Sequence, residues 1–149
     1  MTTKTIEAET KSGKNSFEPN LLAFCCNWCS YAGADLAGLS RLKVPHNVRI
    51  IRTMCSGRVD PQFVIDALEN GADGVLIAAC HPGDCHYINQ NYKTIKRVEL
   101  IHKLFESIGI EKERLRLAFI SAGEGNKFAD TITEMVEQLK QLGPNPLNK

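Results

Sequence analysis

Residues 21–29 of the chain read LLAFCCNWC. The apolar run from Leu21 to Cys25 has the length and composition of a buried parallel strand. Three thiols, at positions 25, 26 and 29, fall where this strand should end. In open parallel sheets the functional crevice lies beyond the carboxyl ends of the strands. The stretch therefore predicts a buried first strand and also the edge of the sheet at which the chemistry takes place.

The rest of the chain repeats this alternation of a short apolar segment with a helical periodicity. Strands are expected over residues 48–54, 74–79 and 115–120, and helices over residues 31–39, 62–70, 93–108 and 127–142. Such an alternation indicates a parallel sheet with right-handed crossovers and helices on its faces. The predicted fold is α/β, a single three-layer domain with a four-stranded parallel sheet, flavodoxin/Rossmann-like.

Several residues mark the expected ends of the helices. Asp60 and Pro61 are typical of a helix start, because Asp accepts hydrogen bonds from exposed N–H groups and Pro suits the first helical position. Gly71 and Gly109 suit the position just past a helix end. In helix 93–108 the apolar stripe that should face the core comprises Val98, Ile101, Leu104, Phe105 and Ile108.

The composition fits one globular domain and narrows the class of partner. The chain has 149 residues, of which 43% are hydrophobic and 23% charged, and its formal net charge of +1 argues against nucleic acid as the main partner. There is no apolar run of about 18 residues, so no membrane span is expected. Residues 1–19 lack the apolar core of a signal peptide, which favours a cytoplasmic location. We expect a flexible N-terminal arm over 1–20, a folded domain over 21–142 and a C-terminal tail over 143–149 whose last few residues fray.

The six cysteines of the chain all follow expected strands. Three follow the first strand, Cys55 follows the second, and Cys80 and Cys85 follow the third. Parallel strands end at one edge of the sheet, so these thiols should meet there. Reduced thiols that cluster in a cytoplasmic protein indicate metal or redox chemistry more often than disulfides.

An iron–sulfur cluster, which is usually held by four cysteine thiolates, fits this arrangement. Cys26 and Cys29 form a tight C-x2-C pair, Cys80 and Cys85 form a looser pair, and Cys55 offers one ligand from a neighbouring strand. These five thiols compete for four places. Cys25 is a sixth choice, because its side chain should point to the opposite side of the strand from that of Cys26.

The residues around the thiols suit a negatively charged cluster. Arg52 and Arg58 flank Cys55, where they either favour the negative charge of a cluster or form ordinary exposed salt bridges. Loops that lead from strands to helices present N–H groups that favour anions. Gly57 and Gly83 have no Cβ, so their N–H groups can approach sulfur closely and tune a reduction potential. Trp28 lies inside the C-x2-C pair, where it either shields a cluster from water or packs as an ordinary large side chain.

Two other functions remain open from the residues alone. The first is a zinc-stabilised interaction module. His81 and His86 are candidate nitrogen ligands to zinc or to a Rieske-like iron, although both are better interpreted as turn residues hydrogen-bonded near the site. The second is a thiol–disulfide oxidoreductase that uses Cys26 and Cys29; it leaves Cys55 and the Cys80 pair without a role. The sequence indicates no catalytic residues for hydrolysis. The Gly123-x-Gly125 sequence lacks the other residues of a phosphate-binding motif and is interpreted as a loop.

Three segments of the sequence carry a specific resemblance to a known family. They read CNWCSYAGAD over residues 26–35, RIIRTMCSGR over 49–58 and GVLIAACHPGDCHY over 74–87. The chain resembles the delta subunit of methyl-viologen-reducing hydrogenase over Leu21 to about Leu142, which is nearly its whole length.

The resemblance implies one 2Fe–2S cluster, whose ligands fall among Cys26, Cys29, Cys55, Cys80 and Cys85. It implies an electron-transfer component of an oxidoreductase complex without substrate catalysis of its own, with residues 21–142 as the iron–sulfur electron-transfer domain. The implied partners are the small subunit of a nickel–iron hydrogenase and the flavin-bearing A subunit (the flavoprotein) of heterodisulfide reductase. The implied setting is flavin-based electron bifurcation in methanogenesis.

Overall fold

The computed structural model describes residues 16–148 of the chain. It contains a four-stranded, all-parallel sheet with the strand order β2-β1-β3-β4. The strands are β1 (Leu21–Cys26), β2 (Val48–Thr53), β3 (Gly74–Ala79) and β4 (Leu115–Phe119). The α helices are α1 (Ser30–Leu39), α2 (Pro61–Glu69), α3 (Gln90–Ile108) and α4 (Gly125–Leu142), and the short 3-10 turns are η1 (Ser56–Arg58) and η2 (Lys112–Arg114). The predicted α/β fold is confirmed, and the strand order is that of the first four strands of a flavodoxin-like sheet.

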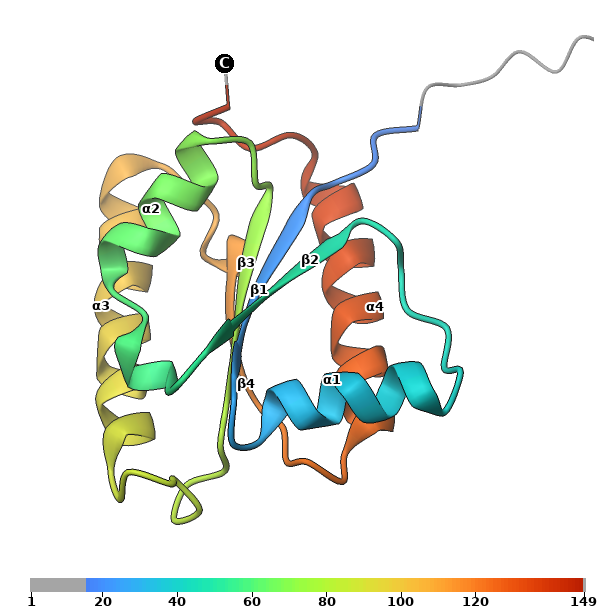
Figure 1. The fold of residues 1–149 in the computed structure, drawn as a ribbon. Helices are drawn as coiled ribbons and strands as arrows, with labels where there is room; N and C mark the ends of the chain where they lie inside the picture. The colour runs from blue at the N-terminus through green and yellow to red at the C-terminus, as the bar shows by residue number, and fades with distance from the viewer. Residues whose placement is uncertain (1–15, 149) are drawn as a thin grey trace, which may run out of the picture.

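The sheet lies between two layers of helices, α1 with α4 on one face and α2 with α3 on the other (Figure 1). Each face of the sheet has its own hydrophobic core. Ala23 and Ala78 point into the core under α1 and α4, whereas Phe24 and Ile77 point into the core under α2 and α3. Side chains alternate along a strand, so neighbours in β1 and β3 belong to opposite layers. All six residues of β3 are buried, which accounts for its continuous apolar sequence.

Glycines permit the close packing of α1. A Cβ at Gly33 would lie 2.8 Å from the carbonyl oxygen of Ser121, and a Cβ at Gly125 would lie 3.0 Å from the backbone nitrogen of Ala37. Helix α1 therefore approaches both the loop after β4 and the start of α4 more closely than side chains would allow. Glycine has a low helix propensity, but this contact requires it at Gly33 inside the helix.

The helix boundaries follow the sequence signals, with one error on α3. The Asp60 carboxylate accepts a hydrogen bond from Gln62 N, and Gly109 adopts the left-handed conformation at φ 79°. The expectation that Leu104 and Ile108 face the core is wrong, because their side chains are 43% and 52% exposed. The buried face of α3 instead comprises Asn91, Thr94, Val98, Ile101 and Phe105.

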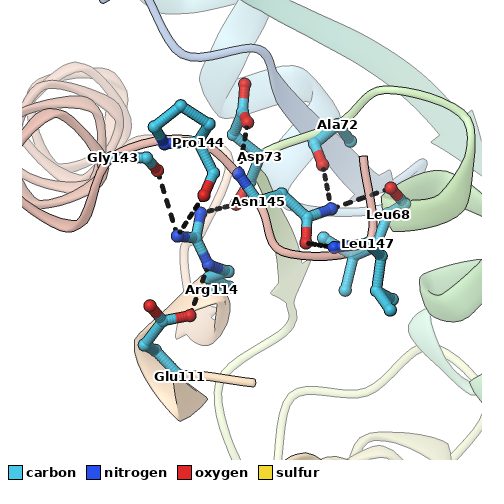
Figure 2. A network of polar contacts seen from close by, with 9 residues as sticks. All are labelled: Leu68, Ala72, Asp73, Glu111, Arg114, Gly143, Pro144, Asn145 and Leu147. Atoms are coloured by element: carbon cyan, nitrogen blue, oxygen red, sulfur yellow. Dashed lines mark hydrogen bonds and ion pairs between the residues drawn. The ribbon is translucent and has the colours of Figure 1, made fainter. Parts of the chain in front are cut away.

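Residues 143–147 lie at the amino edge of the sheet (Figure 1), where they take part in the polar network drawn in Figure 2. The Arg114 guanidinium is fully buried and donates to the carbonyl oxygens of Asp73, Gly143 and Pro144. Asn145 is also buried, and its side-chain amide donates to backbone carbonyls in and after α2. Asn145 of the expected tail is therefore fixed to the domain.

The expected N-terminal arm lies mostly outside the described residues, which begin at residue 16. Its described end contacts the domain, because Asn20 N donates to the Asp73 carboxylate and the Pro19 carbonyl accepts from the Asn47 side chain. Among residues 16–148, no helix is both long enough and apolar enough to cross a membrane.

Candidate metal centre

Three thiols from separate parts of the chain converge at the carboxyl edge of the sheet. Cys26 ends β1, Cys29 directly precedes α1, and Cys80 follows β3. Their Sγ atoms all lie within 4.8 Å of one another, and the Sγ atoms of Cys26 and Cys80 are 3.7 Å apart. All three residues are buried. This is the point between β1 and β3 at which the strand order reverses, where open α/β sheets form their functional crevice.

Ser30 fixes the two central strands at this point. The amide of Cys26 donates to Ser30 Oγ at 2.8 Å, and Ser30 Oγ donates to the carbonyl oxygen of Ala78 at 2.7 Å. Ser30 is completely buried, so neither bond competes with water. The hydroxyl therefore holds the turn that carries Cys26 and Cys29 against the strand that leads to Cys80.

Asn91 fixes the chain on the other side of Cys80. Its side-chain amide donates to the carbonyl oxygens of Cys80 at 3.1 Å and His81 at 2.9 Å, and its side-chain oxygen accepts from Tyr92 N. Asn91 lies in the first turn of α3 and is fully buried. Because each polar atom of this side chain has a partner, the residue ties the backbone at Cys80 to a helix rather than leaving it as a free loop.

The remaining two candidate thiols lie at the margin of this group. Cys55 and Cys85 are partly exposed. The Cys55 sulfur accepts a hydrogen bond from Gly57 N at 3.4 Å, and the thiols of Cys85 and Cys26 add to the burial that raises the pKa of Cys55. A Cβ at Gly57 would lie 2.9 Å from the Gln90 side chain, so the turn that presents this N–H requires glycine. The expected N–H to sulfur contact is thus present at Gly57.

The environment shifts the pKa values of these thiols in opposite directions. A hydrogen bond from the Cys29 thiol lowers the pKa of Cys26 to about 5, although burial opposes this shift. The same hydrogen bond, followed by burial, raises the pKa of Cys29. Burial is also the main cause of the raised pKa of Cys55 and of Cys80. One thiolate is therefore stable at neutral pH, and deprotonation of its neighbours requires a positive charge such as a metal centre.

Cys25 does not belong to this group. Its side chain is completely buried in the core under α1 and α4, as the alternation along β1 predicts. Burial raises the pKa of Cys25 to about 12. A neutral thiol in an apolar core behaves as a small hydrophobic side chain.

The two histidines near the thiols are engaged with other groups. His86 stacks on Trp28, with ring centroids 3.7 Å apart and an angle of 9° between the planes. Trp28 Nε1 also donates to Tyr87 Oη at 3.2 Å. These contacts join the turn of Cys29 to the loop of Cys85. Trp28 is 46% exposed, so it forms an outer aromatic cover rather than a core side chain.

His81 points toward the start of α4, where its Nε2 forms a hydrogen bond with the Glu124 carboxylate. Glu124 also accepts from Ser121 N. Hydrogen bonds with Ser121 and then with His81 lower the pKa of the Glu124 carboxyl to about 2. The interpretation of both histidines as turn residues agrees with these contacts. Ser30, Asn91 and Glu124 were missed from the sequence, since no local motif distinguishes them.

The donor set fits a metal that prefers sulfur. Thiolates that share one tetrahedral metal at about 2.3 Å lie about 3.8 Å from one another, which is close to the 3.7 Å between Cys26 and Cys80. Buried sulfur ligands with N–H donors nearby are typical of iron–sulfur sites. The geometry alone admits zinc as well, because structural zinc also takes four thiolates.

Comparisons with known proteins favour an iron–sulfur centre over zinc. Residues 21–143 match the family model for the delta subunit of methyl-viologen-reducing hydrogenase. The chain is 51% identical over 128 residues to the iron-sulfur D subunit of the F420-non-reducing hydrogenase of Archaeoglobus profundus, covering 86% of this chain and 93% of that protein. It is 48% identical over 134 residues to the iron-sulfur D subunit of the F420-non-reducing hydrogenase vhc of Methanococcus voltae, covering 90% of this chain and 93% of that protein.

A different kind of relative contains the same domain within a longer chain. The A subunit of the Ferredoxin:CoB-CoM heterodisulfide reductase of Methanosarcina mazei is 52% identical to this chain over 126 residues. The match covers 85% of this chain but 16% of that protein. In that relative, the domain is therefore covalently joined to the rest of the reductase polypeptide.

Proposed function

Because this chain belongs to the delta-subunit family of methyl-viologen-reducing hydrogenase, we propose that it is an electron-transfer subunit that holds one 2Fe–2S cluster at the carboxyl edge of its sheet. The observation that carries the proposal is the convergence of Cys26, Cys29 and Cys80 in one buried group. The names of the hydrogenase relatives, which are iron-sulfur subunits, support it. Four thiolates hold 2Fe–2S and 4Fe–4S clusters alike, and the 2Fe–2S type is the one that the resemblance to the family implies.

Cys26, Cys29 and Cys80 provide three of the ligands, and Cys55 provides the fourth. Cys55 follows β2, the strand that pairs with β1, and already accepts the N–H of Gly57, a contact that stabilises a thiolate ligand. Cys85 then remains as the neighbour of Cys55. Ser30 and Asn91 orient the turn and the loop that carry the buried ligands.

The role of the protein is to relay single electrons. A cluster of this kind accepts and donates one electron at a time. The proposed partners are a hydrogenase small subunit on one side and the A subunit of heterodisulfide reductase on the other, in an electron-bifurcating methanogenic complex. Support for the second partner comes from the relative in which this domain is part of the reductase polypeptide, since a covalent link places the two at high effective concentration.

The proposal is tested by electron paramagnetic resonance of the anaerobically purified protein before and after reduction. We expect no signal from the oxidised protein and one slow-relaxing signal, of a single unpaired electron, after reduction. The reduced protein should then be reoxidised by the purified A subunit of heterodisulfide reductase. A protein without a signal in either state, or one that does not exchange electrons with this reductase subunit, contradicts the proposal.

The alternative functions account for less of the structure. Thiol–disulfide exchange at Cys26 and Cys29 needs two thiols, whereas Cys80 lies as close to Cys26 as a shared metal requires. A zinc module explains the thiols but not the names of the hydrogenase relatives. Activity lost only in Cys26 and Cys29 variants, or stoichiometric zinc in a colourless protein, would favour these alternatives.

A further inference from the structure

A groove of about 610 Å³ opens beside Cys55 at the carboxyl end of β2. Arg52 and Met54 form one part of its lining, Arg58 lies in the turn that follows Cys55, and Tyr87 comes from the loop after β3. Cys55 itself lines the groove. A molecule bound there would therefore lie against a sulfur atom that we assign to the cluster.

The surface around the groove displays large apolar side chains. Met54 is 51% exposed, Tyr87 is 43% exposed, and Ile88 is 83% exposed. Ile88 also adopts φ 77°, a conformation that a β-branched residue rarely takes. Backbone strain of this kind persists where the surrounding structure imposes it, and it is concentrated at functional sites. Exposed Met and Tyr side chains are typical anchors of protein–protein interfaces.

Two cations border the groove without a carboxylate partner. The ion pairs within residues 16–148 do not involve Arg52 or Arg58. The Arg52 guanidinium lies over the Tyr31 ring at 5.3 Å, and that of Arg58 lies over the Phe63 ring at 5.2 Å. Stacking on aromatic rings orients the two guanidinium groups and leaves their edges free to donate to carboxylates.

We propose that this groove, beside Cys55, is the docking site for the A subunit of heterodisulfide reductase, which inserts an apolar side chain between Met54 and Tyr87 and presents carboxylates to Arg52 and Arg58. The relative in which the domain and the reductase form one chain supports this occupant, and the cations and exposed apolar side chains of the groove define the surface chemistry that it must match. The inference rests on the proposed function. In the complex the cluster loses the electron that the redox centre of the reductase gains.

The test compares charge variants of the cluster-loaded protein in binding to the purified A subunit of heterodisulfide reductase from the source organism. The double variant R52E/R58E reverses both charges, and R52K/R58K keeps them. The matched control is R49E, because Arg49 is exposed on the same strand but lines a different cavity, with Asn20 and Asn70. Affinity is measured anaerobically by biolayer interferometry at about 50 mM and about 300 mM salt, which screens exposed charges over different distances.

We expect R52E/R58E to weaken binding by about tenfold or more at low salt and to lose most of the salt dependence, because opposed charges become like charges. R52K/R58K and R49E should stay within about twofold of the wild type. R52K/R58K and R49E should keep the visible absorption of the cluster. R52E/R58E is compared with the wild type at equal iron content, because Arg52 and Arg58 flank Cys55 and their charge reversal also acts on the cluster.

The possible negative results distinguish an error in the docking site from an error in the proposed electron-transfer function. If R52E/R58E binds as the wild type does while both exchange electrons with the reductase A subunit, the docking site is wrong and the electron-transfer function stands. If R52E/R58E instead loses binding to the hydrogenase small subunit, or if it changes the self-association of the chain, the reductase is the wrong occupant. If the wild type itself exchanges no electrons with the reductase A subunit, both the function and the docking site are wrong.

Discussion

The Sγ atoms of Cys26 and Cys80 lie 3.7 Å apart although 54 residues separate them in the chain. The sheet brings them together, because β1 and β3 are parallel neighbours and Cys25 is in register with Ala78. Cys26 ends β1 and Cys80 follows β3, so both thiols emerge at the same height. Two neutral thiols at this distance share at most one S–H···S hydrogen bond, whereas two thiolates need a cation between them, which a metal centre would supply.

The thiols should differ sharply in their importance for the cluster. C26S, C29S and C80S are each expected to lose most of the bound iron, because each removes a ligand from the buried group. Iron content and visible absorption are measured on protein purified anaerobically. C55S should behave in the same way, whereas C85S should retain the cluster if Cys55 is the fourth ligand.

C25A is the matched control for these variants. It removes a thiol of the same strand from the core, at a cost of about 1 kcal/mol in unfolding free energy, and should leave the iron content unchanged. Equal loss of iron in C25A and C26S would show that the core, and not ligation, determines retention of the cluster.

Asn91 should control how firmly the loop of Cys80 holds its ligand. N91A leaves the carbonyl oxygens of Cys80 and His81 without their donor, so we expect the free energy of unfolding to fall by about 2 kcal/mol. Loss of iron to a chelator should be several times faster than in the wild type. N89A is the control, because the exposed Asn89 makes no side-chain capping bond at the start of α3. If N91A and N89A lose iron at the same rate, Asn91 does not position the ligand.

Arg114 should stabilise the domain without affecting the cluster. R114L leaves three backbone carbonyl groups without a donor in the interior, which should cost roughly 3 kcal/mol in urea denaturation. The position of the visible absorption bands of the folded protein should not change, because this network (Figure 2) includes Asp73 just before β3, whereas the thiols lie at the carboxyl ends of the strands. R116L provides the comparison, since Arg116 pairs with an exposed glutamate and should cost less than about 1 kcal/mol. An R114L protein as stable as R116L would contradict this account of the tail.

The ion pair of Glu111 with Arg114 predicts a specific dependence on pH. A hydrogen bond from Arg114 lowers the pKa of the Glu111 carboxyl below its ordinary value of 4.5. A lowered pKa in the folded state stabilises the protein above the unfolded-state value, and this contribution is lost as the pH falls through the folded-state value. E111Q should therefore be less stable than the wild type at pH 7, and the difference should shrink only below about pH 4.5. A difference that is constant from pH 7 to about pH 3 would exclude this ionisation as its cause.

Much of the fold follows from local patterns in the sequence. The apolar segments place all four strands, and β3 has the predicted bounds of Gly74–Ala79. The error on α3 has a physical cause: two overlapping apolar stripes run along this helix, and periodicity alone does not show which one faces the sheet. The exposed stripe includes Leu104 and Ile108, and the buried face includes polar residues that pair near the thiols.

The residues that support the site were harder to predict. The convergence of Cys26, Cys29 and Cys80 follows from the topology, since parallel strands end at one edge. Ser30 and Asn91 act through contacts with backbone groups 48 and 11 residues away, and a sequence gives no sign of such partners. The buried Arg114 likewise donates to backbone carbonyls of Gly143 and Pro144, 29 and 30 residues away, and no local pattern shows such partners.

The most direct test of the central claim is the content of iron and acid-labile sulfide in the anaerobically purified protein, with zinc measured on the same sample. We predict two iron atoms and two sulfides for each chain and little zinc. One zinc atom for each chain without sulfide, or neither metal in a protein that folds and keeps its thiols reduced, would contradict the presence of a cluster.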